Sequence, residues 1–79
     1  GKLGIGVNNV GEDVELAVAG PVRIHGKKQE VGNREPTDGT YVKGDIVWNS
    51  DPSPTGYVGW VCTREGSPGV WKSFGQISN

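Results

Sequence analysis

The side chains of this chain that could do chemistry are flat aromatic rings. All of them fall between positions 41 and 75, where they are Tyr41, Trp48, Tyr57, Trp60, Trp71 and Phe74. Rings of this size either anchor a small core or present an apolar face to a ligand such as a sugar. Trp48 and Tyr57 flank a loop that contains Pro52 and Pro54, and Trp71 follows a Gly-Ser-Pro-Gly turn. Their expected positions at strand ends make Trp48, Tyr57 and Trp71 candidate stacking platforms for a glycan.

Polar residues beside these rings could bind sugar hydroxyls, and the candidates are Asp45, Asn49 and Asp51. Asp45 follows Gly44, so its alternative role is to accept backbone N–H bonds and hold a tight turn. Trp60 is the ring that we expect in the core. Cys62 lies in the same predicted strand, and we expect it to behave as a small buried hydrophobe.

The sequence has few residues that could support catalysis. His25 and Cys62 are the single histidine and the single cysteine, and no Gly-x-Ser-x-Gly motif is present. One histidine and one cysteine fall short of the four ligands of a structural zinc, and an intrachain disulfide needs a second cysteine. None of the nine acidic residues stands in a setting that would raise a carboxyl pKa for glycoside hydrolysis. We therefore expect a protein that is not an enzyme, with no cofactor and no metal.

Composition limits the partners. Lys and Arg number 8 against 9 Asp and Glu, a net charge of −1 that offers no footprint for nucleic acid or an anionic membrane. No apolar run is long enough to cross a bilayer, so no membrane insertion is expected. A chain of 79 residues is near the size at which one core seldom suffices, so close packing or association with other copies is expected. The first residue, Gly1, and the lack of methionine suggest an excised domain or a processed product.

Apolar residues recur with a period of two, which is typical of strands, and no stretch has a helical period. Short strands are expected near residues 3–7, 13–19 and 22–25, then near 57–63 and 70–74. Between these groups, residues 41–42 and 46–48 form either a strand pair around residues 43–45 or one strand bent at Gly44. The polar residues 27–40 read as a linker or long loop. The fold class that follows is all-β, with short antiparallel strands and long loops, divided into a β-rich stem segment (1–26), the linker (27–40) and an aromatic module (41–79).

The aromatic module resembles the small chitin- and cellulose-binding modules of bacterial glycoside hydrolases. The resemblance lies in Tyr41-x-x-Gly44-Asp45-x-Val47, Gly59-Trp60-x-Cys62 and Gly66-x-Pro68-Gly69-x-Trp71-x-x-Phe74-Gly75. It implies a sugar-binding scaffold. This chain departs from the pattern in having no tryptophan before Tyr41, and Thr63 and Arg64 where such modules have an aromatic pair, so the ligand is expected to differ.

The first half resembles a segment found near the C-terminal ends of bacteriophage tail fibres and tailspikes. The residues concerned are Gly1-Lys-Leu-Gly-Ile-Gly-Val-Asn-Asn-Val10 and Val14-Glu-Leu-Ala-Val-Ala-Gly-Pro-Val-Arg-Ile-His-Gly26, with Gly-Asp-Ile-Val-Trp-Asn49 and Trp-Lys-x-Phe-Gly75 further on. This resemblance implies an intertwined parallel homotrimer at the virion's tail tip, outside the host cell. Threefold packing would also supply the core that the N-terminal strands cannot form alone.

These observations favour a non-catalytic tail-fibre or tailspike domain that binds host cell-surface polysaccharide. Two alternatives stay open at this stage. The chain could be a trimerisation or folding cap with its tryptophans buried and no ligand, or a monomeric carbohydrate-binding module of a secreted hydrolase. The monomeric alternative leaves the strands of the first half without a purpose.

Overall fold

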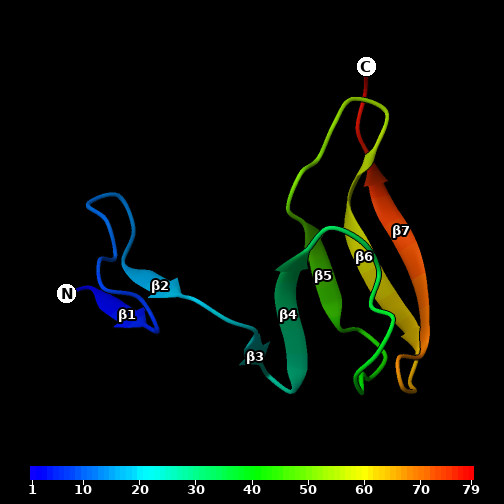
Figure 1. Cartoon of the computed structure of the whole chain (residues 1–79), viewed down its shortest axis with the longest axis horizontal. Coiled ribbons are helices and arrows are strands. Elements are labelled where there is room, and N and C mark those ends of the chain that lie inside the picture. Colours follow the sequence, from blue (N-terminus) through cyan, green and yellow to red (C-terminus); the bar gives the residue numbers. More distant parts are fainter.

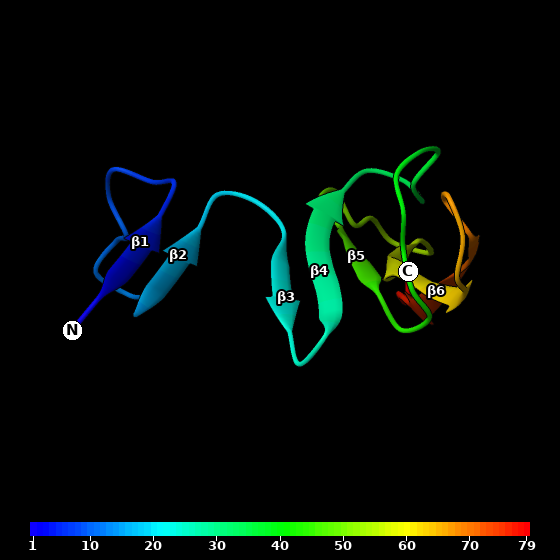
Figure 2. The same cartoon turned by 90° about the horizontal axis from the view of Figure 1, so that it is seen from below.

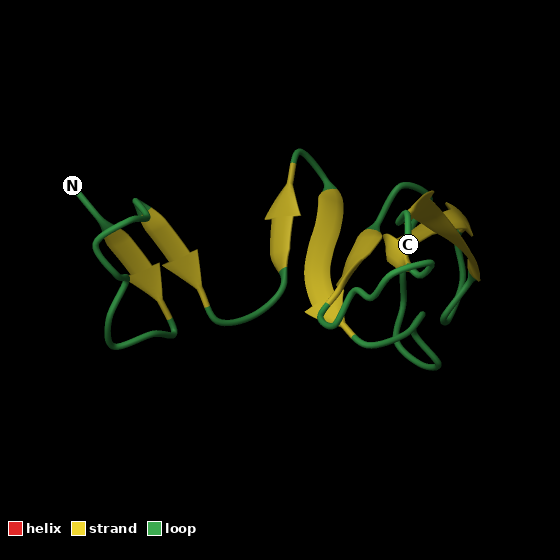
Figure 3. Ribbon diagram, turned by 90° about the horizontal axis from the view of Figure 1, so that it is seen from above, coloured by secondary structure: helices red, strands yellow, loops and turns green.

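The computed structural model describes the whole chain, residues 1–79, as seven strands in two sheets with no helix (Figures 1 and 3). The strands are β1 (Leu3–Ile5), β2 (Leu16–Val18), β3 (Val22–Ile24), β4 (Lys27–Gly32), β5 (Ile46–Asn49), β6 (Tyr57–Arg64) and β7 (Val70–Gln76). The all-β prediction is confirmed. Pairing is mixed, because β1–β2 and β4–β5 are parallel while the other three pairs are antiparallel as expected.

The larger sheet has five strands in the order β3-β4-β5-β6-β7. Its first hairpin turns at His25 and Gly26, which both have positive φ, 50° and 83°. Two such residues between paired Ile24 and Lys27 suit the right-handed twist of a two-residue hairpin. The expectation of a loop over residues 27–40 is therefore wrong for Lys27–Gly32, which form a strand paired on both sides.

A long connection from residue 33 to residue 45 joins β4 to β5. Parallel neighbours cannot be joined by a tight hairpin, so the chain must cross over the sheet between them. The crossover brings Tyr41 against the buried side chains Val47, Cys62 and Trp71. We call this side the inner face of the sheet. The polar residues after β4 thus cover the core rather than separate two domains in space.

The crossover ends in a turn closed by the backbone of Asp45, whose N–H donates to the carbonyl of Val42 at 3.1 Å. Gly44 has a φ of +99°, as the third residue of a type II turn requires. The N–H of Cys62 then donates to the Asp45 carbonyl at 2.9 Å, so the turn is fixed to β6.

The smaller sheet is the parallel pair β1–β2, which we call the N-terminal unit (residues 1–19). It pairs with no strand of the five-stranded sheet and lies apart from it in Figures 1 and 2. The register sets Leu3 beside Leu16 and Ile5 beside Val18, so these four apolar side chains share one face. A two-stranded sheet is marginal by itself in water, so the pairing of β1 with β2 alone gives this unit little stability.

The core is small for the length of the chain. Only 5 of 79 residues are buried. The accessible surface is 5705 Å², whereas a compact monomer of 8.4 kDa exposes about 4,600 Å². The radius of gyration is 14.0 Å, against about 11.6 Å for a compact chain of this length. Backbone–backbone hydrogen bonds number 32, against roughly 55 expected. A single chain therefore leaves much surface and many backbone groups without a protein partner.

Candidate binding surface

One face of the five-stranded sheet is covered by the crossover and the other is not. The inner face carries the core beneath the crossover. On the opposite side, which we call the outer face, the register aligns Trp48 of β5, Gly59 of β6 and Phe74 of β7 in one row. Tyr57 lies two residues before Gly59 in β6 and therefore on the same face. Three of the six aromatic rings thus gather on the uncovered side.

Trp48 is held in place while one side of its ring stays free. Its indole Nε1 donates to Oε1 of Gln29 at 3.2 Å. The Phe74 ring meets it edge to face, with centroids 5.9 Å apart at 71°. Gly59 lies between the two rings, and a Cβ there would come within 3.1 Å of Phe74 and within 2.6 Å of the Val47 carbonyl. The missing side chain is what lets the rings meet, and the indole remains 38% exposed.

Tyr57 stands at the start of β6, 39% exposed. The preceding loop is fixed by Asn49, whose Nδ2 donates to the Tyr57 carbonyl at 2.9 Å and whose Oδ1 accepts the N–H of Asp51 at 2.9 Å. The loop is also tied to the C-terminal end, because the N–H of Thr55 donates to the carbonyl of Ile77 at 3.0 Å. Asn49 is therefore a positioning residue, and the exposed Asp51 carboxylate is the polar group left for a ligand.

Two of the residues predicted to bind sugar lie elsewhere. Trp71 is 9% exposed on the inner face, where its Nε1 donates to the Pro68 carbonyl at 2.8 Å and its ring packs edge to face on Tyr41, 5.0 Å between centroids. Asp45 is 2% exposed, and its two carboxylate oxygens accept the N–H groups of Lys28 at 2.8 Å and Val42 at 3.0 Å. Both side chains are used by the fold, which corrects their assignment as glycan contacts. Asp45 instead has the alternative role expected for it, because its carboxylate accepts backbone N–H bonds and holds the turn.

The strongest electrostatic perturbation is also on the inner face. Burial raises the pKa of the Tyr41 phenol to about 12, helped by its hydrogen bond to Glu30 and by the nearby carboxylates of Asp38 and Asp45. The phenol donates to Oε1 of Glu30 at 2.7 Å, and Nζ of Lys28 lies 4.1 Å from the ring centroid. Tyr41 is thus a protonated structural residue at neutral pH.

Gln29 and Val31 also lie on the outer face, although their polar surroundings in the sequence predict a linker. Gln29 orients the Trp48 indole, and Val31 pairs with Trp48 across β4 and β5. A signal was present: in Lys27–Gly32, residues 29 and 31 alternate with Lys28 and Glu30, which turn to the inner face toward Tyr41.

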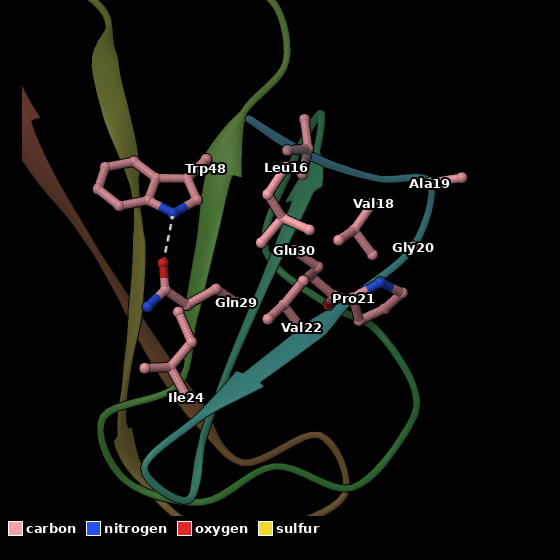
Figure 4. Close-up of a pocket in the computed structure, with 11 residues that line it drawn as sticks. Leu16, Val18, Ala19, Gly20, Pro21, Val22, Ile24, Gln29, Glu30 and Trp48 are labelled. Atoms are coloured by element: carbon pink, nitrogen blue, oxygen red, sulfur yellow. Dashed lines mark hydrogen bonds between the residues drawn. The ribbon is translucent and has the colours of Figure 1, made fainter. Parts of the chain in front are cut away.

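An apolar groove of about 530 Å³ adjoins Trp48. One wall is the apolar face of the N-terminal unit and the other is the outer face of β3 to β5 (Figure 4). Its apolar lining includes Leu16, Val18, Val22, Ile24, Val31 and Trp48.

No group of three or more His, Cys, Asp or Glu side chains is placed to hold a metal ion. No helix is long and apolar enough to cross a membrane. Cys62 is a free, buried thiol, as expected, and its Sγ donates to the Arg64 carbonyl.

Comparisons of the chain with models of protein families, with curated protein sequences and with solved structures give no match.

Proposed function

We propose that this chain is a non-catalytic binding domain at the C-terminal tip of a phage tail fibre or tailspike, and that it binds host cell-surface glycan as a subunit of a homotrimer. The observation that carries the binding role is the pair of part-exposed rings, Trp48 and Tyr57, beside a loop that is fixed at both ends. The sequence resemblance supports the setting. The surface left open on the single chain supports association with other copies.

Binding would use stacking and hydrogen bonds without any bond being made or broken. Trp48 and Tyr57 are diagonal neighbours on one sheet face, which sets the two residues roughly 7–8 Å apart, with their Cβ atoms somewhat closer. Rings at this spacing can contact successive apolar faces of a saccharide chain, while the Asp51 carboxylate accepts hydrogen bonds from sugar hydroxyls. Asn49 keeps the loop and Tyr57 in register.

A single site of this kind is shallow, since two rings and one carboxylate converge on it. Three copies on one tip would raise the effective concentration of neighbouring sites, provided that the repeating glycan can span them. Binding to a polymer should therefore be much tighter than binding to one repeat unit.

The test is titration of the chain against purified bacterial surface polysaccharides, first arrayed and then in solution. We expect Tyr57→Ala and Trp48→Ala each to weaken binding about 3- to 10-fold, as the loss of one aromatic contact would. Val58→Ala is the matched control, because Val58 is equally exposed on the same strand but faces away from Trp48. Absence of binding to every polysaccharide, or equal losses in Val58→Ala, would remove the glycan-binding proposal.

A second candidate function is a trimerisation or folding cap without a ligand. The excess of about 1,100 Å² of exposed surface over a compact monomer favours it specifically. Under this alternative, deletion of residues 41–75 from the parent fibre abolishes trimer assembly, whereas loss of a pure binding module leaves trimers intact.

A further inference from the structure

The apolar groove beside Trp48 has two apolar walls that stay separated within one chain. Leu16 and Val18 line it from the N-terminal unit, and Ile24 and Val31 line it from the sheet. Val31 is 70% exposed, the highest value among the large apolar side chains. Val31 lies beyond the end of β3 and pairs with β5 alone, and with Ile24, which is 56% exposed, it forms an open apolar surface of the kind that marks an interaction site.

The N-terminal unit presents a matching surface. Leu3 and Ile5 extend the face that Leu16 and Val18 form, and they are 57% and 53% exposed. The backbone edges of β1 and β2 away from each other have no strand partner within the chain. A small unit with one apolar face and open edges gains stability by docking on another surface. The five-stranded sheet of the same chain does not pair with it.

The amount of exposed surface favours another copy of the chain as the molecule that covers the groove. The surface in excess of a compact monomer is about 1,100 Å² per chain. In a closed ring each chain takes part in two interfaces, once through its N-terminal unit and once through its outer face, so there is one interface per chain. Each interface would then bury about 1,100 Å² in total, close to the ~1,200 Å² lower bound of stable interfaces. The groove lining is largely apolar, as suits a self-association surface rather than a charged partner.

We infer that copies of this chain associate by docking the β1–β2 unit of one copy, through Leu3 and Ile5, onto the outer face of β3–β5 of the next copy. This inference rests on the proposed function for the assembly of several copies and adds the surface that forms it. The groove-side edge of Trp48 is then covered by the neighbouring copy, while Tyr57 stays outside the groove.

The first experiment is the solution mass of the full chain by light scattering coupled to gel filtration, at two concentrations. We expect Val31→Glu and Leu16→Glu to reduce the oligomer to the mass of one chain. The matched control is Val70→Glu, since Val70 is 41% exposed on β7 and does not line the groove, and it should keep the wild-type mass. Tryptophan emission should shift to longer wavelength in Val31→Glu, because the Trp48 edge returns to water.

The second experiment tests the contact itself by cross-linking. Chains carrying Ile5→Cys or Val31→Cys, each in a Cys62→Ala background and with different tags, are refolded together and oxidised. We expect a disulfide-linked pair that contains both tags, and none when Val70→Cys replaces Val31→Cys.

The possible results separate this inference from the proposed function. A wild-type oligomer that Val31→Glu leaves intact, with no mixed disulfide, overturns the docking surface alone. A wild-type chain that is monomeric at both concentrations overturns the docking surface and the trimer together, while glycan titration still decides the binding role. A dimer broken by Val31→Glu supports the docking surface and refutes threefold assembly.

Discussion

Replacement of Asp45 by alanine should be among the most damaging single changes to this fold. The carboxylate is 2% exposed and accepts one N–H from β4, at Lys28, and one from the crossover, at Val42. Each hydrogen bond to a buried charged group is worth about 1.5–3 kcal/mol, and alanine leaves both N–H groups without a partner. We expect a loss of about 3–5 kcal/mol, out of a total stability of roughly 4–12 kcal/mol for a chain of this length.

The assay is urea denaturation followed by tryptophan fluorescence, at one fixed protein concentration because association would add to stability. The control is Asp51→Ala, which removes an exposed carboxylate and should change the free energy of unfolding by less than about 0.5 kcal/mol. If Asp45→Ala were as stable as Asp51→Ala, the carboxylate could not be bridging β4 and the crossover, and its assignment to the fold would be refuted.

Two more predictions concern stability. Burial raises the pKa of Tyr41 to about 12, helped by the hydrogen bond to Glu30 and by nearby carboxylates. The protonated phenol therefore stabilises the fold fully below pH about 10, and this stabilisation is lost as the pH rises from about 10 to about 12. The free energy of unfolding should fall by roughly 1–2 kcal/mol over this range, after allowance for solvent screening. Urea midpoints across this range should fall more in the wild type than in Tyr41→Phe, and parallel curves would contradict the shift. Gly69→Ala should cost about 2–4 kcal/mol, because φ is +85° and a Cβ would collide with the Arg64 carbonyl. The control Gly20→Ala, with nothing within 4 Å of the added Cβ, should be near neutral in the same measurement, and equal losses would refute the steric argument.

The strands that the sequence predicted well are those with a local signal. Tyr57–Arg64 was predicted to within one residue because apolar and aromatic residues with high strand preference alternate there. The Val70–Gln76 strand was likewise found, although its end was placed two residues early. In these segments the side-chain period alone fixes the conformation.

The strand Lys27–Gly32 was missed because its inward-facing side chains are polar. Lys28 lies over the Tyr41 ring and Glu30 accepts the Tyr41 hydroxyl, so long polar chains cover an aromatic ring on the inner face. A composition rule reads such a segment as a loop. The His25-Gly26 pair before it was the usable sign, because both residues tolerate the positive φ of a two-residue hairpin.

The exposure of individual tryptophans could not be read from the sequence, since it depends on where the crossover runs. Trp48 and Trp71 both stand near strand ends, and the local sequence does not distinguish them. Trp71 is buried because the crossover brings Tyr41 onto it from thirty positions away. Trp48 lies on the other face, which no segment of the chain crosses.

This asymmetry between the two faces follows from the connections. Only β4 and β5 are parallel neighbours in the large sheet, so only their link must pass over a face, and it passes over the inner one. The links β5–β6 and β6–β7 join antiparallel neighbours and stay at the ends of the strands. The β3–β4 hairpin likewise joins antiparallel neighbours. The N-terminal unit lies apart from the sheet and leaves Val31 exposed. Within residues 1–79 the outer face of the sheet therefore has no covering segment comparable to the crossover. The apolar groove suits a second copy, and the ring pair beside the fixed loop suits a saccharide, so the two proposed partners occupy adjoining parts of one face.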